Sequence, residues 1–174
     1  MVYRVLIAAV LFCSSAWARL DVAFTPSVDC EQRIVDLINQ SREKIDVAVY
    51  ALNNTQIVDA LKKAHDRGVV IRILTDRLQA SGKSSKVRDL YQAGINLKVH
   101  SVYKIEHNKF AVFDGEKMVT GSYNWTNPAT QKNSENCLFV FDDERIIGAY
   151  QRRFDELWAL NSQKKSEAWF LKNL

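Results

Sequence analysis

Strand-like and helix-like apolar patterns alternate between residues 21 and 74, and this alternation constrains the fold more than any other feature. Residues 21–25, 44–52 and 69–74 have the composition and spacing of strands, while residues 31–42 carry apolar side chains at helical spacing. A second helix is predicted between residue 55 and Gly68, which suits a helix C-terminus. Strands that alternate with helices predict an α/β layer with right-handed crossovers.

The second half of the chain changes to a hairpin pattern. Residues 109–114 and 117–122 predict two paired strands joined by a turn at Asp114-Gly115. The remaining predicted elements are a loop at 77–86, a helix from 87 to Gly94, strands at 97–99 and 138–141, and a last helix that begins at Asp142 or Asp143. Because there is no repeat or linker, we predict that residues 19–174 form one domain. We predict an α/β fold with a central mixed, mostly parallel β-sheet flanked by helices on both faces.

The N-terminus has the layout of a secretory signal peptide. Arg4 precedes an apolar run from residue 5 to residue 12, and Ala16-Trp17-Ala18 forms a small-residue cleavage pattern. We predict removal of residues 1–18, a secreted or periplasmic enzyme, and no stable membrane anchor after cleavage; an uncleaved anchor is the alternative. Cleavage leaves Cys30 and Cys137, which either pair or remain buried thiols.

The charge is mildly basic, with a formal net charge of +4 and a pI of about 9.0. Such a surface attracts polyanions, although a merely soluble basic protein fits the totals equally well. Lys83, Lys86, Lys104 and Lys132 are candidates for following a polyanion backbone, while a solvated surface is the default for each residue alone.

Polar residues at fixed spacing between residues 107 and 136 carry the predicted chemistry. His107 and Lys109 share one face of a strand, and Ser122 and Asn124 share one face of the next. If the strands pair, an imidazole, an ammonium, a hydroxyl and a carboxamide converge. Lys109, Ser122 and Asn124 are predicted to bind phosphate oxygens, and His107 to act as nucleophile or acid–base. Asp114 belongs to the same pattern, but its opposite parity favours a structural role.

This pattern, His-x-Lys-x4-Asp-x6-Gly-Ser with Asn two residues later and Ser134-Glu135-Asn136 beyond, resembles the motif of the phospholipase D superfamily. It is most similar to the short bacterial nucleases that carry one motif per chain. The resemblance implies a catalytic set of His107, Lys109, Asp114 and Glu135. It also implies a phosphohistidine intermediate, no metal ion or cofactor, and a homodimer through the active-site face that supplies the second histidine. Glu135 is the implied partner that fixes the histidine tautomer.

The substrate stays open between three alternatives. The first is a nucleic acid, either DNA alone or DNA and RNA, cleaved by a non-specific endonuclease. The second is a phosphatidylcholine-type phospholipid, and the third is a nucleic-acid-binding module without catalysis. Tyr123 and Trp125 flank Asn124 and suit either base stacking or core packing. His65 and His100 are predicted to be structural.

Overall fold

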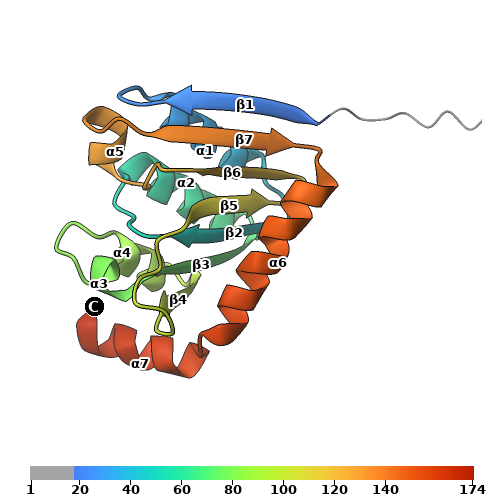
Figure 1. Cartoon of the computed structure of the whole chain (residues 1–174). Coiled ribbons are helices and arrows are strands. Elements are labelled where there is room, and N and C mark those ends of the chain that lie inside the picture. The colour runs from blue at the N-terminus through green and yellow to red at the C-terminus, as the bar shows by residue number, and fades with distance from the viewer. Residues whose placement is uncertain (1–17) are drawn as a thin grey trace, which may run out of the picture.

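One seven-stranded sheet organises the chain in the computed structural model, which describes residues 18–174 (Figure 1). The strand order is β1-β7-β6-β5-β2-β3-β4. The predicted signal peptide lies outside the described residues except for Ala18. No helix within the described part of the chain has the length and apolar character needed to cross a membrane.

The strands and helices follow the predicted order, with additions. The strands are β1 (Arg19–Phe24), β2 (Lys44–Val49), β3 (Val70–Asp76), β4 (Asn96–His100), β5 (Lys109–Phe113), β6 (Lys117–Gly121) and β7 (Asn136–Phe141). The helices are α1 (Asp29–Gln40), α2 (Thr55–Asp66), α3 (Arg77–Ala80), α4 (Val87–Gln92), α5 (Asn127–Gln131), α6 (Glu144–Leu160) and α7 (Gln163–Asn173). The sequence patterns missed α3 and α5, which are very short, and α7.

The prediction of an α/β fold with a mixed sheet is confirmed, but "mostly parallel" is wrong. Only β2–β3 and β3–β4 pair in parallel, and the other four neighbouring pairs are antiparallel. The βαβ pattern accounts for the parallel part. The hairpin half of the chain then adds β5 and β6 through a short turn, which permits only antiparallel pairing. After the longer segment that contains α5, β7 also pairs antiparallel with β6, and β1 closes the edge beside β7.

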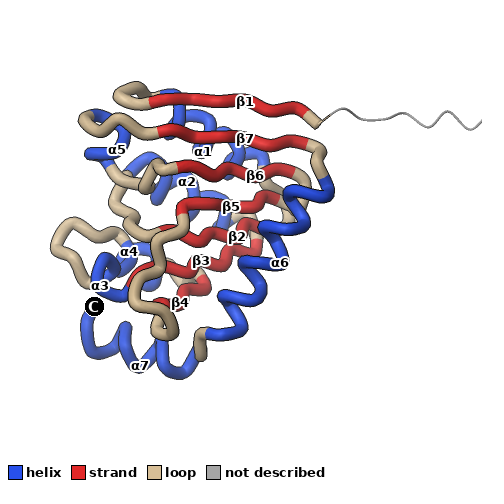
Figure 2. The backbone as a smooth tube through the Cα atoms, in the orientation of Figure 1, coloured by secondary structure: helices blue, strands red, loops and turns tan. Residues whose placement is uncertain are grey.

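Helices cover both faces of the sheet, as predicted (Figure 2). On one face, the main core packs α1 and α2 against the sheet through residues such as Ile38, Leu61 and Ile73. On the other face, α6 crosses the sheet and buries Phe154, Leu157 and other apolar side chains. Burial of these side chains provides the main stabilisation of both layers.

The topology brings several strand ends to one edge of the sheet. Val49, the last residue of β2, is in register with Lys109 at the start of β5 and with Thr75 near the end of β3. Gly121 at the end of β6 is in register with Cys137 near the start of β7. We call this edge the site edge, because the motif residues gather there, and the opposite edge the far edge.

A disulfide links α1 to β7. Cys30 and Cys137 form the bond with a Cα–Cα distance of 6.0 Å, so the alternative of two buried thiols is not what the structure contains. The bond joins positions 107 residues apart in the sequence. It ties the helical layer directly to the strand that follows the motif.

Candidate active site

A polar pocket of about 420 Å³ opens at the site edge and is lined by motif residues. Its lining consists of His107, Lys109, Gly121, Ser122, Asn124 and Glu135. The polar motif residues therefore gather in one pocket, as predicted, but most of them do not lie on strands. Lys109 is the first residue of β5 and Gly121 the last of β6, so the other four lie just beyond the strands. Loop residues held by strand ends form the site, a common arrangement for functional residues.

Tyr50, which sequence reasoning missed, packs against both basic motif residues. Its ring centroid lies 4.7 Å from that of His107, and Lys109 Nζ lies 5.2 Å from the Tyr50 ring centroid. Lys109 Nζ also donates a hydrogen bond of 2.6 Å to the His107 carbonyl oxygen. Burial lowers the pKa of Lys109, and the nearby carboxylates of Glu135 and Glu106 oppose that shift. The His107 imidazole and the Lys109 ammonium therefore both lie near the Tyr50 ring.

Ser122 and Glu135 are joined by a hydrogen bond. Ser122 Oγ donates to Glu135 Oε2 at 2.5 Å and accepts from the backbone N–H of Asn136 at 3.1 Å. Asn133 Nδ2 donates to the other carboxylate oxygen of Glu135 at 3.0 Å. The hydroxyl predicted to bind phosphate is thus oriented by the Ser134-Glu135-Asn136 segment.

Gly121 is required where β6 meets that segment. Its φ is +148°, and a Cβ at this position would lie 2.2 Å from the Asn136 carbonyl oxygen. Only glycine permits this approach of two backbones. The glycine of the motif therefore has a steric role in bringing Ser122 next to Asn136.

Two polar residues of the pocket remain, Asn124 and His107. Asn124 Oδ1 is buried and accepts no hydrogen bond from residues 18–174, so it is available for a donor. His107 is exposed. Within the same residues, no hydrogen bond joins Glu135 to the His107 imidazole, so the tautomer-fixing role of Glu135 stays a prediction.

Asp114 lies away from the pocket, at the other end of β5 near the far edge. Its carboxylate accepts backbone hydrogen bonds from Arg42, Glu43 and Lys44 at 3.0, 2.9 and 2.9 Å. These bonds lower the pKa of Asp114 against the opposing effect of burial. Asp114 does not line the pocket, and its geometry fits the structural role inferred from its parity, so its place in the catalytic set stays a prediction of the resemblance.

The other aromatic and histidine candidates lie outside the pocket. Tyr123 and Trp125 have 2% and 1% of their surface exposed, which resolves their two alternatives in favour of core packing. Burial raises the pKa of Tyr123 to about 12. His100 is buried, and His65 lies in α2, outside the pocket. Within residues 18–174, no three His, Cys, Asp or Glu side chains are grouped to hold a metal ion.

Comparisons with known proteins agree with this geometry. Residues 34–158 match the family described as cardiolipin synthase, PLD-like domain. The chain is 34% identical over 126 residues to the mitochondrial cardiolipin hydrolase of Chlamydomonas reinhardtii, covering 72% of this chain and 56% of that protein. It is 36% identical over 133 residues to the phospholipase D of Rickettsia bellii, covering 76% and 66%. The chain thus spans less than two thirds of the length of these relatives.

A solved structure shares the fold. Nuc of Salmonella typhimurium, a phospholipase D family member, superposes with a TM-score of 0.79 at 24% identity, over 84% of this chain and 97% of that one. The likeness shows that the fold of this chain is one already seen in a solved structure.

Proposed function

The chain belongs to the phospholipase D-like family, and from that premise we propose that it is an exported phosphodiesterase that hydrolyses nucleic acid without a metal ion. The observation that carries the proposal is that His107, Lys109, Ser122 and Asn124 line the same pocket. An ammonium, a hydroxyl and a carboxamide around an exposed imidazole suit a phosphodiester, whose anionic oxygens need charge and hydrogen bonds.

The proposed reaction has two steps. A neutral His107 nitrogen attacks phosphorus, a histidine–phosphorus bond forms, and the bond from phosphorus to the leaving oxygen breaks as a second imidazole protonates that oxygen. The second imidazole then takes a proton from water, the water oxygen attacks phosphorus, and the histidine–phosphorus bond breaks. Lys109, Ser122 and Asn124 hold the phosphate oxygens in both steps.

The second imidazole is proposed to come from a second copy of the chain. His65 lies outside the pocket and His100 is buried, so within residues 18–174 one pocket contains one catalytic histidine. A two-fold homodimer through the site edge would bring both copies of His107 to one phosphate. The two copies of Lys109 would then neutralise its charge.

The distribution of charge supports a polyanionic substrate. Exposed cations lie in the connections at the site edge: Arg77 at the start of α3, Lys83 in the loop that follows it, Lys104 between β4 and β5, and Lys132 before β7. Within residues 18–174, none of these four takes part in an ion pair. Such cations beside a phosphodiester site would bind the phosphate groups of a nucleic-acid backbone.

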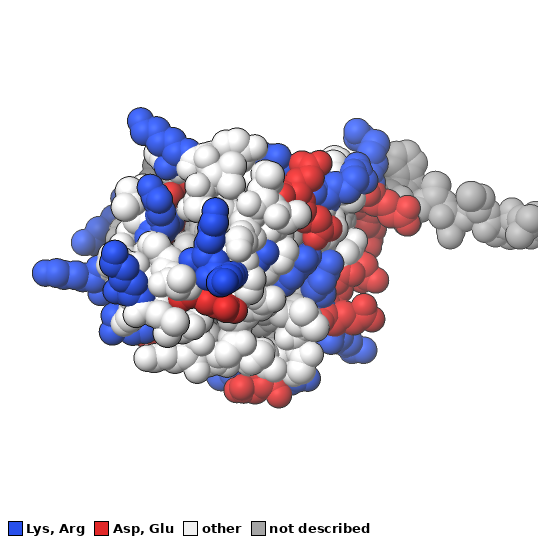
Figure 3. Space-filling view, turned by 90° about the horizontal axis from the view of Figure 1, so that it is seen from below, with Lys and Arg blue, Asp and Glu red and all other residues white. Residues whose placement is uncertain are grey.

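The far edge has the opposite balance. Its loops carry five acids (Glu43, Asp114, Glu116, Asp142 and Asp143) against two arginines (Arg42 and Arg67). In the view from below, Lys and Arg predominate on the left, the side of the site edge in Figure 1, while Asp and Glu lie mainly at the centre and right (Figure 3). The resulting field would orient a polyanion towards the pocket.

A phospholipid substrate is the second candidate. The loop that leads into His107 exposes Val102, Tyr103 and Ile105, with 50%, 51% and 46% of their surfaces accessible. Apolar side chains beside a phosphodiester site suit a lipid interface, and two of the relatives are named a phospholipase D and a cardiolipin hydrolase.

The deciding experiment incubates the protein without residues 1–18, in EDTA, with plasmid DNA and separately with phosphatidylcholine vesicles. We expect plasmid nicking and its loss in His107→Ala by about 10³-fold or more. His65→Ala, which removes an imidazole outside the pocket, serves as the matched control and should keep full activity. Choline release without nicking would favour the phospholipase, and plasmid retention without cleavage would favour the binding module.

The proposed dimer is tested by the mass of the native protein together with its activity. Analytical ultracentrifugation across the concentrations used in the assay should show a dimer wherever nicking is observed. Full turnover by a monomer would refute the shared site.

A further inference from the structure

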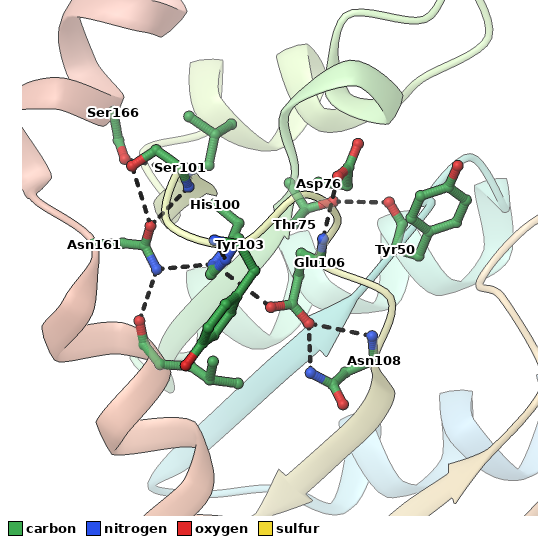
Figure 4. A network of polar contacts seen from close by, with 12 residues as sticks. Tyr50, Thr75, Asp76, His100, Ser101, Tyr103, Glu106, Asn108, Asn161 and Ser166 are labelled. Carbon is green, nitrogen blue, oxygen red and sulfur yellow. Dashed lines mark hydrogen bonds and ion pairs between the residues drawn. The ribbon is translucent and has the colours of Figure 1, made fainter.

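Glu106, the residue before His107, is a buried carboxylate that the proposed reaction does not use. Only 1% of its surface is exposed. Burial of a carboxylate is costly unless hydrogen bonds and charges compensate for the lost water. Figure 4 shows the polar network around it, which joins the ends of β3 and β4 to the loop that enters β5. Because this buried carboxylate directly precedes His107 in the chain, we expect its role to lie in the active site.

Glu106 fixes the chain on both sides of His107. Its Oε1 accepts hydrogen bonds from the Asn108 backbone N–H at 3.2 Å and from Asn108 Nδ2 at 2.6 Å. Its own backbone N–H donates to Asp76 Oδ2 at 3.2 Å. The Asn108 carbonyl in turn accepts from the Tyr50 backbone N–H at 2.9 Å. Residues 106 and 108 are therefore held, and His107 between them projects into the pocket.

The second carboxylate oxygen of Glu106 lies near the His100 ring. Oε2 of Glu106 lies 3.6 Å from His100 Nδ1, while His100 Nε2 accepts from the Tyr103 backbone N–H at 2.8 Å. Asn161 Nδ2 lies 3.0 Å from the same Nδ1. Burial lowers the pKa of His100, which favours the neutral ring, so the neutral ring gives Glu106 no compensating positive charge.

The Lys109 ammonium contacts the Tyr50 ring and the His107 carbonyl oxygen. The negative charges of Glu135 and, less strongly, of Glu106 oppose the effect of burial on the pKa of Lys109. Glu135 is bonded to Ser122 and Asn133, whereas Glu106 is bonded to the segment that carries His107.

We infer that Glu106 is a positioning residue of the active site, which holds the His107-x-Lys109 segment in place through its hydrogen bonds to Asn108 and Asp76. The experiment also measures a secondary effect, that of the Glu106 charge on the Lys109 ammonium. The catalytic part of this inference rests on the proposed phosphodiesterase function. The charge part does not, because Lys109 titrates whether or not the protein is an enzyme.

Glu106→Gln tests the charge, since glutamine keeps the shape and an oxygen for Asn108. A pH titration of the lysine side chains by heteronuclear NMR, assigned with Lys109→Arg, should show that Lys109 loses its proton at lower pH in the variant. The kcat for plasmid nicking should fall about tenfold, with KM changed much less, since a slightly misplaced catalytic group costs rate more than binding. Glu116→Gln, which removes an exposed carboxylate at the far edge, is the matched control and should change neither.

A second variant separates geometry from charge. Asn108→Ala keeps the Glu106 carboxylate but removes one of its hydrogen bonds, so kcat should fall while the Lys109 titration stays at its wild-type position. Both variants must keep the wild-type circular dichroism spectrum. If Glu106→Gln does not fold, Asn108→Ala alone decides, and wild-type kcat in that variant overturns the inference.

The outcomes distinguish this inference from the function on which it builds. An unchanged Lys109 titration and a kcat within twofold of wild type in Glu106→Gln overturn the role of Glu106. A wild-type protein that cleaves no phosphodiester refutes the proposed function instead, while the titration still decides the charge part.

Discussion

Replacement of Asp114 should destabilise the protein without disabling its chemistry, although this residue belongs to the sequence motif. The carboxylate holds three consecutive backbone N–H groups, those of Arg42, Glu43 and Lys44, and so fixes the start of β2 to the turn between β5 and β6. Asp114 has a φ of +52°, a conformation that Asn tolerates much better than Ala. Asp114→Asn therefore isolates the loss of charge, and Asp114→Ala adds the loss of both oxygens and backbone strain.

The magnitude follows from the three bonds. A hydrogen bond to a charged group contributes about 1.5–3 kcal/mol net. The bonds from Arg42 and Glu43 are exposed, and water replaces such partners at little cost. We therefore expect a loss of about 2–3 kcal/mol for Asp114→Ala, well below the sum of three bonds, and about 1–2 kcal/mol for Asp114→Asn. For a chain of this size, the larger loss lowers Tm by roughly 5–10 °C.

The effect on catalysis should be small because of distance. Asp114 follows Lys109 by five positions along β5, which corresponds to about 17 Å at the rise of a strand. That separation is about twice the Debye length of roughly 8 Å at physiological ionic strength. The kcat of the folded variants should stay within about twofold of wild type.

The pH dependence provides a second check. The folded-state pKa of Asp114 is depressed, so its stabilisation is fully present above the unfolded-state pKa and is lost as pH falls through the folded-state pKa. The Tm difference between wild type and Asp114→Asn should therefore be largest near neutral pH and shrink in acid. The assays are thermal unfolding followed by circular dichroism and plasmid nicking below Tm, with Glu116→Gln as a neighbouring control. A variant with wild-type Tm and a hundredfold loss of kcat would refute the structural role.

Three further predictions concern the disulfide and the pocket. Replacing Cys30 and Cys137 by Ser should cost about 3–5 kcal/mol, as expected for a closed loop of this length; calorimetry of the double variant should show a lower Tm that dithiothreitol no longer changes, and equal Tm values would contradict it. Gly121→Ala should lose at least about 2 kcal/mol of stability and most activity, because its Cβ would collide with the Asn136 carbonyl; a crystal structure with an undisturbed backbone would count against this. Activity should fall at alkaline pH as Lys109 loses its proton, beginning below the ordinary lysine range because burial lowers its pKa, and any activity left in Lys109→Arg should lack that decline in a pH–rate profile.

Local patterns allowed much of the fold and the identity of the motif residues to be predicted. The helices around Ile38 and Leu61 and the turn at Asp114-Gly115 were recognisable because spacing and turn residues act over a few neighbours. The parallel share of the sheet was overstated, because strand composition does not reveal which neighbour a strand chooses. The helix α7 was missed because its apolar residues recur only weakly at helical spacing.

The site shows the same division. His107, Lys109, Ser122 and Asn124 were predicted from spacing and Glu135 from the resemblance to the family. All five line one pocket, whereas their catalytic roles stay predictions. Tyr50 and Glu106 were missed because no short-range pattern links them to the motif. Tyr50 reaches the pocket only because the end of β2 lies beside the start of β5. Glu106 stands next to His107 in sequence, yet its burial and its contacts with His100 and Asp76 exist only in the folded chain.

The sequence by itself determined the alternation of elements, the single motif and the residue types that suit a phosphodiester, since each depends on spacing within one segment. The tertiary structure decided which strands pair, that Cys30 bonds to Cys137, that Asp114 lies at the far edge, and that the carboxylate of Glu106 is buried and bonded to Asn108. These are contacts between segments distant in sequence or consequences of burial. They are set by how the whole chain packs its core and satisfies its buried polar groups.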